Sequence, residues 1–487
     1  MRSGLGLALL PLLSAVPALS FDNSRYDNVA VYWGQNSYGA ANGNDPANWQ
    51  KTLSYYCQDD SIDVIPVSFI TSFFATGGLP ELNLASTCNK GDNATFPGTS
   101  LANCQRLSTD IKFCQSKGKM LTLSLGGAHA STTFTGDAQA RTFATTIWNL
   151  FLGGSSSTRP FGDAILDGVD LDIESGNGAY YPAFVEQLRS HFNGASKKYY
   201  VTAAPQCVYP DAALGTVLQN SFLDAIYVQF YNNPCGINHY PTASSWNFGI
   251  WDQWARTISK NPNVKVYVGA PAQSTAGGGY QPVSKVNEIA TAMRKAFPSF
   301  GGVMLWDASQ AYVNNRFERA IKTSLKAAGG TGFTYPACST ATAYKTGVNY
   351  SGGSKVAYNG YIYQAKWSAS QTPGMNPMGE WSAVSACQGS GSDGPGNPGE
   401  PGNPGGGCGG VAAWSSGAVY TGGQQATHVG RLWQAKWWTQ NETPGGASGV
   451  WEDKGACLAR EGAAKEESKP EAKETEERKR SRVFRDL

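Results

Sequence analysis

The chain has 487 residues, 41% of them hydrophobic, so it is long enough for two or more domains with ordinary buried cores. Its formal net charge of +2 gives no electrostatic reason to expect a nucleic-acid partner. No stretch reaches the roughly 18 apolar residues that a membrane-spanning helix requires, so no membrane partner is predicted.

The first twenty residues form a pattern typical of a secretory signal peptide. Arg2 precedes an apolar stretch at 5–13, and Ala18-Leu19-Ser20 supplies small residues for cleavage. An N-terminal core helix is the alternative. We expect residues 1–20 to be removed and the protein to be secreted, with association with a cell wall left open. Three Asn-X-Ser/Thr triplets are compatible with glycosylation: Asn93, Asn349 and Asn441.

Ten cysteines agree with an oxidising, extracellular route. No pair has the Cys-x-x-Cys spacing of a zinc site and the histidines are scattered, so we predict no metal and no cofactor. The cysteines fall into an early, a middle and a late group: Cys57, Cys88, Cys104 and Cys114; Cys207 and Cys235; Cys338, Cys387, Cys408 and Cys457.

Short apolar runs alternate with longer stretches over residues 27–306. Eight such units predict an α/β fold, a (β/α)8 TIM barrel over residues 21–330. A doubly wound open sheet is disfavoured, because Trp33-Gly34-Gln35-Asn36 follows the first run where a glycine-rich phosphate loop would be expected. The expected strands are Val29–Trp33, Val64–Phe69, Met120–Leu125, Gly168–Ile173, Tyr199–Ala204, Ala225–Gln229, Val264–Ala270 and Gly302–Trp306.

The last third of the chain contains an internal repeat at an offset of 70 residues. The offset aligns 364–367 with 434–437, both reading Gln-Ala-Lys-Trp, and it aligns Trp381 with Trp451. We predict two small β-rich modules, a first module at 336–387 and a second module at 408–457. Each has a cysteine near either end, so Cys338–Cys387 and Cys408–Cys457 are the natural disulfides, and such a staple suits a core this small.

Two further segments lack residues that could pack. Residues 388–407 are rich in glycine and proline and are expected to form a tether between the modules. Residues 458–487 carry mixed charge without an apolar face and are expected to be a disordered tail.

The acidic run Asp167-Gly-Val-Asp170-Leu-Asp172-Ile-Glu174 lies on the fourth expected strand. Alternate side chains of a strand share a face, so Asp170, Asp172 and Glu174 project together. The intervening apolar residues suit the helix layer, which places the carboxylates inside the barrel. Glu174 lies about 13 Å beyond Asp170 at about 3.3 Å per residue, at the mouth where barrel enzymes carry their chemistry.

Three carboxylates on one narrow face cannot all ionise without cost. Repulsion between like charges, together with burial, raises at least one pKa and leaves a shared proton near neutral pH. A general acid needs this condition, and glycoside hydrolysis needs a general acid. A solvated acidic strand and a calcium site are the alternatives. The apolar alternation disfavours the first, and the absence of a turn with a mid-loop glycine disfavours the second.

The run matches the DxxDxDxE signature of glycoside hydrolase family 18, and Leu123-Ser124-Leu125-Gly126-Gly127 matches that family's SxGG motif. Further matches follow other expected strands. Together they resemble the plant-type (class III) chitinases, including the fungal members, over about residues 27–325. These further matches are Tyr32-Trp33-Gly34-Gln35-Asn36, Ala203-Ala204-Pro205-Gln206-Cys207, Gln229-Phe230-Tyr231-Asn232-Asn233 and Leu305-Trp306-Asp307.

The resemblance implies catalytic roles for residues of these motifs. Glu174 would protonate the glycosidic oxygen, and the substrate's own 2-acetamido carbonyl would act as nucleophile. Asp172 would orient the acetamide N–H and Tyr231 would donate a hydrogen bond to its oxygen. Asp170 would share a proton with Asp172, with Ser124 as its hydrogen-bond partner, and Asp167 would be structural.

The resemblance also implies residues that bind substrate. Trp306 would form the floor beneath the sugar, unless it is simply a core tryptophan. Gln229, Gly126 and Ser124 are the other substrate-binding candidates in the barrel. The family's cysteine spacing implies three further disulfides: Cys57–Cys114, Cys88–Cys104 and Cys207–Cys235. From spacing alone, the four early cysteines allow three connectivities.

The two modules resemble carbohydrate-binding modules of family 5/12, which have an AKW motif followed by a tryptophan. Exposed aromatic rings can cover the flat sugar faces of a crystalline polysaccharide. Some of these rings must instead form each module's core, and the sequence does not separate the two roles. The candidates are Trp367, Trp381, Trp437 and Trp451.

These observations predict a secreted, monomeric endochitinase that cleaves β-1,4 bonds of chitin with retention of configuration, through an oxazolinium intermediate. Chitin and chito-oligosaccharides are the expected partners. A chitin-binding lectin on the same barrel is one alternative, which Glu174 disfavours. A wall-remodelling transglycosylase is another, and the sequence does not separate it from a hydrolase.

Overall fold

The structure is a computed structural model that describes residues 21–176, 178–389 and, with short gaps, 411–456. It divides the chain into two compact units, with the boundary between residues 399 and 400. The predicted signal segment, most of the predicted tether and the predicted tail lie outside the described residues, as do Cys408 and Cys457.

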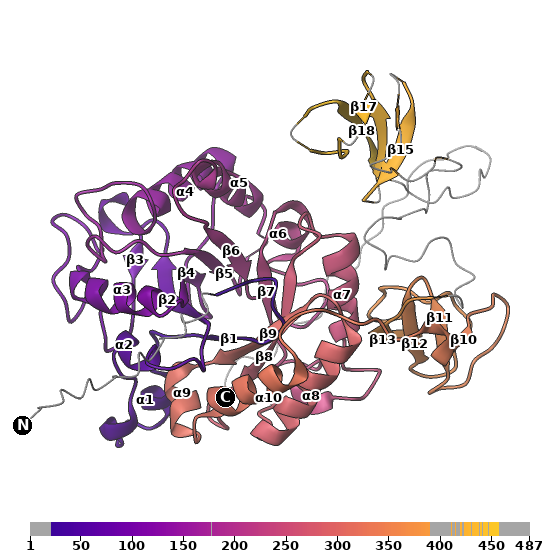
Figure 1. Cartoon of the computed structure of the whole chain (residues 1–487). Coiled ribbons are helices and arrows are strands. Elements are labelled where there is room, and N and C mark those ends of the chain that lie inside the picture. The colour runs from indigo at the N-terminus through magenta and orange to yellow at the C-terminus, as the bar shows by residue number, and fades with distance from the viewer. Residues whose placement is uncertain are drawn as a thin grey trace, which may run out of the picture. The chain divides into compact units, whose positions relative to one another are not determined.

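Residues 28–306 form a closed parallel barrel (Figure 1). The sheet order is β1-β9-β8-β7-β6-β5-β4-β2-β3, and a pairing of β1 with β2 closes the ring. The short β3 (Glu81–Leu82) is antiparallel to β2 and lies outside the ring of eight. All eight predicted strands are present, with ends shifted by at most three residues. They are β1 (Asn28–Val31), β2 (Val64–Ser72), β4 (Met120–Gly126), β5 (Gly168–Asp172), β6 (Tyr200–Ala203), β7 (Ala225–Gln229), β8 (Lys265–Pro271) and β9 (Phe300–Trp306).

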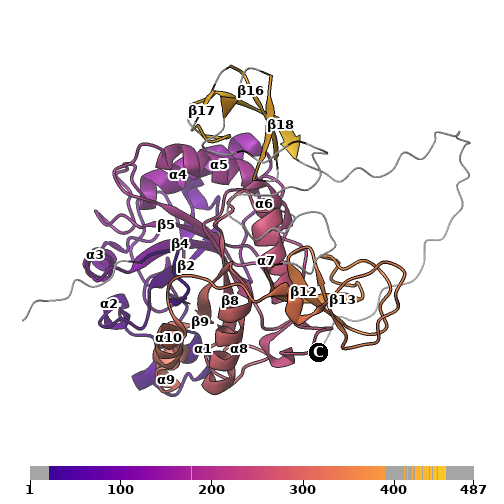
Figure 2. The same cartoon turned by 45° about the vertical axis from the view of Figure 1, so that its right-hand side comes forward.

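Helices connect successive strands and surround the barrel (Figures 1 and 2). This confirms the predicted (β/α)8 fold. No helix among the described residues is long and apolar enough to cross a membrane. The helices are α1 (Ser37–Ala41), α2 (Leu53–Tyr56), α3 (Ser108–Ser116), α4 (Asp137–Phe151), α5 (Tyr181–Phe192), α6 (Gly215–Asn220), α7 (Phe248–Thr257), α8 (Val283–Ala296), α9 (Ala308–Val313) and α10 (Phe317–Ala328).

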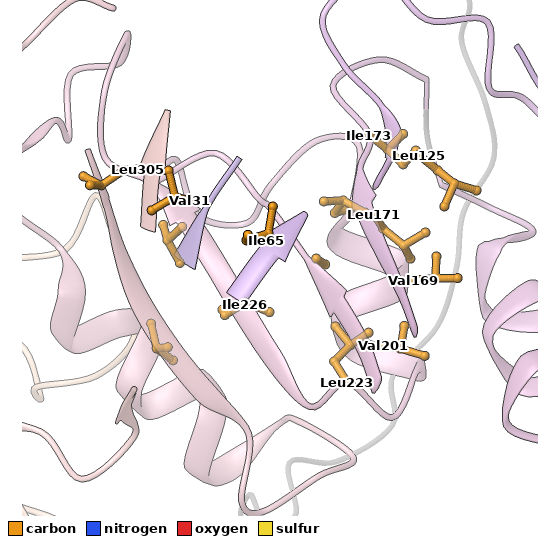
Figure 3. Packing of buried hydrophobic residues seen from close by; sticks show 14 of the residues in the cluster. Val31, Ile65, Leu125, Val169, Leu171, Ile173, Val201, Leu223, Ile226 and Leu305 are labelled. Atoms are coloured by element: carbon orange, nitrogen blue, oxygen red, sulfur yellow. The ribbon is translucent and has the colours of Figure 1, made fainter. Parts of the chain in front are cut away.

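The barrel has two separate packing layers, because strand side chains alternate between its two faces. Val169, Leu171 and Ile173 of the β5 segment belong to the larger cluster, which lies between the strands and the helices (Figure 3). A smaller cluster fills the interior and includes Tyr32 and Tyr227. The carboxylates of β5 therefore face the inside of the barrel, as the alternation predicts.

Four disulfides are present among the described residues: Cys57–Cys114, Cys88–Cys104, Cys207–Cys235 and Cys338–Cys387. These agree with the expected pairs, and none of the described cysteines is free. The fifth expected pair, Cys408–Cys457, lies outside the described residues.

Two small β-rich regions follow the barrel. Three strands of the first recur 70 residues later in the second: 355–358 as 425–428, 361–365 as 431–435 and 381–386 as 451–456. The first has β10 (Thr342–Ala343), β11 (Lys355–Tyr358), β12 (Tyr361–Ala365) and β13 (Trp381–Ala386). The second has β14 (Val419–Tyr420), β15 (Gln425–His428), β16 (Arg431–Ala435), β17 (Thr439–Gln440) and β18 (Trp451–Ala456).

Candidate active site

Asp170 lies inside the barrel with no exposed surface. Three hydroxyl groups donate hydrogen bonds to its carboxylate: Tyr32 (2.8 Å) and Ser124 (2.7 Å) to Oδ2, and Thr202 (2.6 Å) to Oδ1. Burial raises the pKa of Asp170, and these hydrogen bonds act in the opposite direction. Asp170 is therefore fixed in place, with its acceptor oxygens occupied by protein donors.

Asp172 follows two residues later on the same face and is 4% exposed. The Gln229 side-chain amide at the end of β7 donates to Asp172 Oδ1 (2.9 Å) and to the Ala204 carbonyl (3.0 Å). Burial raises the pKa of Asp172 well above its ordinary value, and the charges of Glu174 and Asp170 add to the rise. Asp172 thus holds a proton more readily than an ordinary aspartate.

Glu174 lies just past the end of β5 and is half-buried. Burial raises its pKa, the charge of Asp211 raises it further, and a hydrogen bond from Gln229 and the charge of His129 lower it. Asp211 is itself 6% exposed and accepts hydrogen bonds from the backbone N–H groups of Gln206, Ala213 and Leu214. A carboxyl with these surroundings can donate a proton at the barrel mouth.

Gly126 and Gly127 allow β4 to approach β5 closely at the site. A Cβ on Gly126 would lie 2.0 Å from the Asp172 carbonyl oxygen, and its φ of +120° is one that other residues rarely adopt. The Gly127 N–H donates to that same carbonyl (2.8 Å). The glycine pair therefore fixes the backbone of Asp172, and the two glycines also line the cleft.

A cleft of about 560 Å³ opens over the carboxylates. Trp306, at the end of β9, lies on its wall and stacks on Phe69, with ring centroids 5.9 Å apart and planes 13° apart. The interplay of an apolar ring wall with a few polar groups suits a sugar ring. Other lining residues are Gln35, Thr71, Asn83, His129, Asp172, Glu174, Gln229, Tyr231, Asn232 and Ala276.

Tyr231 lies on the cleft wall after β7 and is 7% exposed. Burial raises its pKa well above its ordinary value, with further rises from Asp172 and Glu174. The phenol therefore keeps its proton and can act as a hydrogen-bond donor to a ligand.

Two predicted positions have other surroundings. Ser124 was a candidate for substrate binding, but it is fully buried beneath the cleft and bonds Asp170, so it supports that carboxylate instead. Asp167 lies at the opposite end of β5, where Oδ2 accepts from the Leu121 N–H (2.8 Å) and Oδ1 pairs with Lys197 (2.7 Å). Its structural role agrees with the expectation.

Several cleft residues were not predicted. Gln35 and Asn232 belong to motifs already quoted, and Phe69 ends its strand as Trp306 does, so these three had a signal. Asp211 and His129 had none, because loop residues that meet only through the fold follow no spacing rule.

The module aromatics divide by burial. Trp367 is 47% exposed and Trp437 is 55% exposed, so both rings are open to a ligand. Trp381 is 3% exposed and donates from its indole to the Gln371 carbonyl (2.7 Å). Trp451 is 6% exposed and donates likewise to Glu442 (2.8 Å). Trp381 and Trp451 are therefore core residues, which corrects the binding role expected for them.

No group of three or more His, Cys, Asp or Glu side chains with metal-site geometry occurs within the part of the chain that the structure describes. The carboxylates of β5 instead have hydroxyl, amide and backbone donors as neighbours.

Family models match two segments of the chain. The model of glycosyl hydrolases family 18 matches residues 28–291, and the model of carbohydrate-binding module family 5/12 matches residues 413–452. The first segment contains the carboxylate run of β5 and most of the barrel. The second contains Trp437.

Proteins with similar sequences or structures cover the barrel. Chitinase 2 of Rhizopus oligosporus is 45% identical over 331 residues, which are 68% of this chain and 58% of that protein. Endochitinase 33 of Trichoderma harzianum is 40% identical over 332 residues, 66% of this chain and 98% of that protein. A crystal structure of a chitinase from Ipomoea carnea has 32% identity and a TM-score of 0.50, covering 61% of this chain and 99% of that one.

The match spans about 58–60% of the length of the first curated relatives. The family model covers more than half of this chain, and a relative with 40% identity is covered almost completely. On these grounds, the chain is a member of family 18 of the glycosyl hydrolases.

Proposed function

We propose that the protein is a secreted endochitinase that hydrolyses β-1,4 bonds between N-acetylglucosamine units with retention of configuration. The observation that carries the proposal is the pair Asp172 and Glu174 at the cleft floor, both with raised pKa values. Most of the chain's barrel is shared with proteins named as chitinases, which supports this substrate class.

Glu174 is the general acid. Its raised pKa keeps the carboxyl protonated at a pH where an ordinary glutamate is ionised, so it can give its proton to the glycosidic oxygen. As the C1–O bond breaks, the leaving sugar takes that proton and Glu174 becomes a carboxylate.

The acetamide oxygen of the bound sugar attacks C1 and closes an oxazolinium ring. Asp172 accepts a hydrogen bond from the acetamide N–H and stabilises the positive charge that develops there, while Gln229 holds the Asp172 carboxylate in position. Tyr231, protonated on the cleft wall, donates to the acetamide oxygen. The nucleophile therefore belongs to the substrate, which restricts the reaction to sugars with a 2-acetamido group.

Water then attacks C1 from the face that the leaving group vacated. Glu174, now a carboxylate, accepts a proton from this water, and the oxazolinium ring reopens to the acetamide. Two successive inversions at C1 give net retention, and Glu174 returns to its starting protonated form.

Chitin is the proposed polymer, and its insoluble form is the proposed target. The exposed ring of Trp437 lies in the segment that matches family 5/12, which supports a sugar-binding surface in the second module. We assign the first module to the same repeat, and the barrel to the plant-type (class III) branch, on the motifs quoted above. Four disulfides support an extracellular location.

Digestion of colloidal chitin by wild type and by Glu174→Gln tests the proposal. We expect wild type to release chito-oligosaccharides and Glu174→Gln to lose nearly all turnover while still binding chito-oligomers. Substantial turnover by the variant would rule out Glu174 as the acid. Products longer than the starting oligomers would indicate transglycosylation rather than hydrolysis.

A further inference from the structure

Helix α7 directs one continuous stripe of side chains at the first module. Gly249, Asp252, Gln253 and Arg256 are spaced by three or four residues, so they lie along one face of the helix. Each of the four contacts the first module. In both views, strands β12 and β13 lie beside α7 (Figures 1 and 2).

The centre of this interface is a buried polar group. The Tyr361 hydroxyl donates to Asp252 Oδ2 (2.7 Å), and the Arg256 guanidinium lies 3.7 Å from that oxygen and 5.1 Å from the Tyr361 ring. Asp252 Oδ1 accepts from the backbone N–H (3.0 Å) and the hydroxyl (2.5 Å) of Ser299. Asp252 has no exposed surface and Tyr361 is 2% exposed. Because a buried carboxylate needs all of its partners, this group fixes the register of the contact.

The flanks of the interface are equally close. The Tyr363 hydroxyl donates to Gln253 Oε1 (2.8 Å), and Tyr363 is 2% exposed. A Cβ on Gly249 would lie 2.1 Å from the Ala383 carbonyl oxygen, so the helix and the strand meet where only a glycine fits. Burial of both tyrosines makes the first module continuous with the barrel's outer layer.

The second module has different residues on the corresponding face. At the offset of 70 residues, Tyr361 is replaced by Arg431 and Ala383 by Asp453. Arg431 Nε and Asp453 Oδ2 form an ion pair (2.6 Å), with side chains 44% and 35% exposed. A charged, hydrated pair of this kind opposes burial, whereas tyrosine and alanine favour it.

We infer that the two copies have diverged. The first module is a fixed structural part of the catalytic unit, docked on α7 through Tyr361 and Tyr363, and the second alone serves as the sugar-binding module. The second half of this statement rests on the proposed function. It agrees with the match to family 5/12 in the second copy and with Ser368 in the first copy, where the second has Trp438.

Calorimetry and limited proteolysis of the full chain test the docking. The variants are Gly249→Ala, which forces a Cβ into the Ala383 carbonyl, and Arg431→Ala as the control at the position matched to Tyr361. We expect wild-type barrel and first module to unfold in one transition. Gly249→Ala lowers its midpoint by about 2 °C or more and speeds cleavage within residues 329–336 about tenfold, whereas Arg431→Ala changes neither.

Unchanged unfolding and cleavage in Gly249→Ala would overturn the docking. If that variant does not fold, Tyr361→Phe and Tyr363→Phe make the same test, because each removes one hydrogen bond and keeps the ring. Both are expected to lower the midpoint, and no change in either would also count against the docking.

Sedimentation with insoluble chitin tests the division of roles. We expect Tyr361→Phe and Arg431→Ala to be retained as wild type is, and Trp437→Ala to lose retention. Loss in Trp367→Ala together with full retention in Trp437→Ala would reverse the assignment. If wild type itself were not retained, the chitin-binding proposal would fail, while calorimetry would still decide the docking.

Discussion

The Gln229 side-chain amide donates a 2.9 Å hydrogen bond to Asp172 Oδ1, joining the ends of strands β7 and β5 across the barrel mouth. The same amide also donates to the Ala204 carbonyl, so both of its N–H groups are used. Asp172 therefore has one fixed carboxylate oxygen, and its raised pKa reflects burial and the neighbouring Glu174 and Asp170 charges.

Asp172→Asn is expected to be inactive but more stable. A raised folded-state pKa means that the folded protein holds the Asp172 proton more tightly, so ionisation costs stability as pH rises above the unfolded value of about 3.9. Asparagine has no such cost and can still accept from Gln229. We expect the variant's Tm to exceed that of wild type near neutral pH, with a gap that shrinks as pH falls toward 3.9. Thermal melts across pH measure this, and a gap that grew on acidification would contradict it.

His129→Ala is expected to shift the pH profile of the reaction. The positive charge of His129 lowers the pKa of Glu174, so its removal lets Glu174 keep its proton to higher pH. Because the acid must be protonated, the alkaline limb of kcat/KM for a soluble chito-oligomer should move upward. His239→Ala serves as the control, since His239 does not line the cleft. A shift of the limb to lower pH would contradict the assigned influence of His129.

Gly126→Ala is expected to destabilise the barrel and abolish activity. The new Cβ would meet the Asp172 carbonyl at 2.0 Å with φ at +120°, so β4 or β5 must move. Positive-φ strain alone costs about 1–3 kcal/mol, and displacement of Asp172 removes the reaction geometry. Gly43→Ala, where nothing lies within 4 Å, is the matched control and should leave both properties unchanged. Denaturant unfolding and turnover measure the pair, and equal behaviour of the two variants would count against this role.

Trp437→Ala and Trp451→Ala are expected to differ within one module. Trp437 is 55% exposed, so its loss should weaken retention on chitin and leave unfolding unchanged. Trp451 is 6% exposed, and truncation of a buried tryptophan costs about 3–5 kcal/mol, so that module should unfold. Circular dichroism and sedimentation with chitin separate these outcomes. Full retention by Trp437→Ala would show that its ring is not the binding surface.

The positions of the barrel strands and of the main carboxylates could be predicted from the sequence. Alternation of apolar and polar residues along a strand is a local property, so it places Asp170, Asp172 and Glu174 on one face before any contact is known. The eight strands were predicted to within three residues for the same reason. The repeat at an offset of 70 likewise survives as strands that recur with the same offset.

Contacts between distant positions required the tertiary structure. Asp211 and His129 influence Glu174 from loops that no spacing links to it, and Ser124 proved to be buried under Asp170 rather than open to substrate. Similarity of the two copies also concealed their difference. The sequence by itself determined that the module is repeated, but only the fold decided that Tyr361 meets Asp252, because burial depends on which surfaces the folded chain brings together.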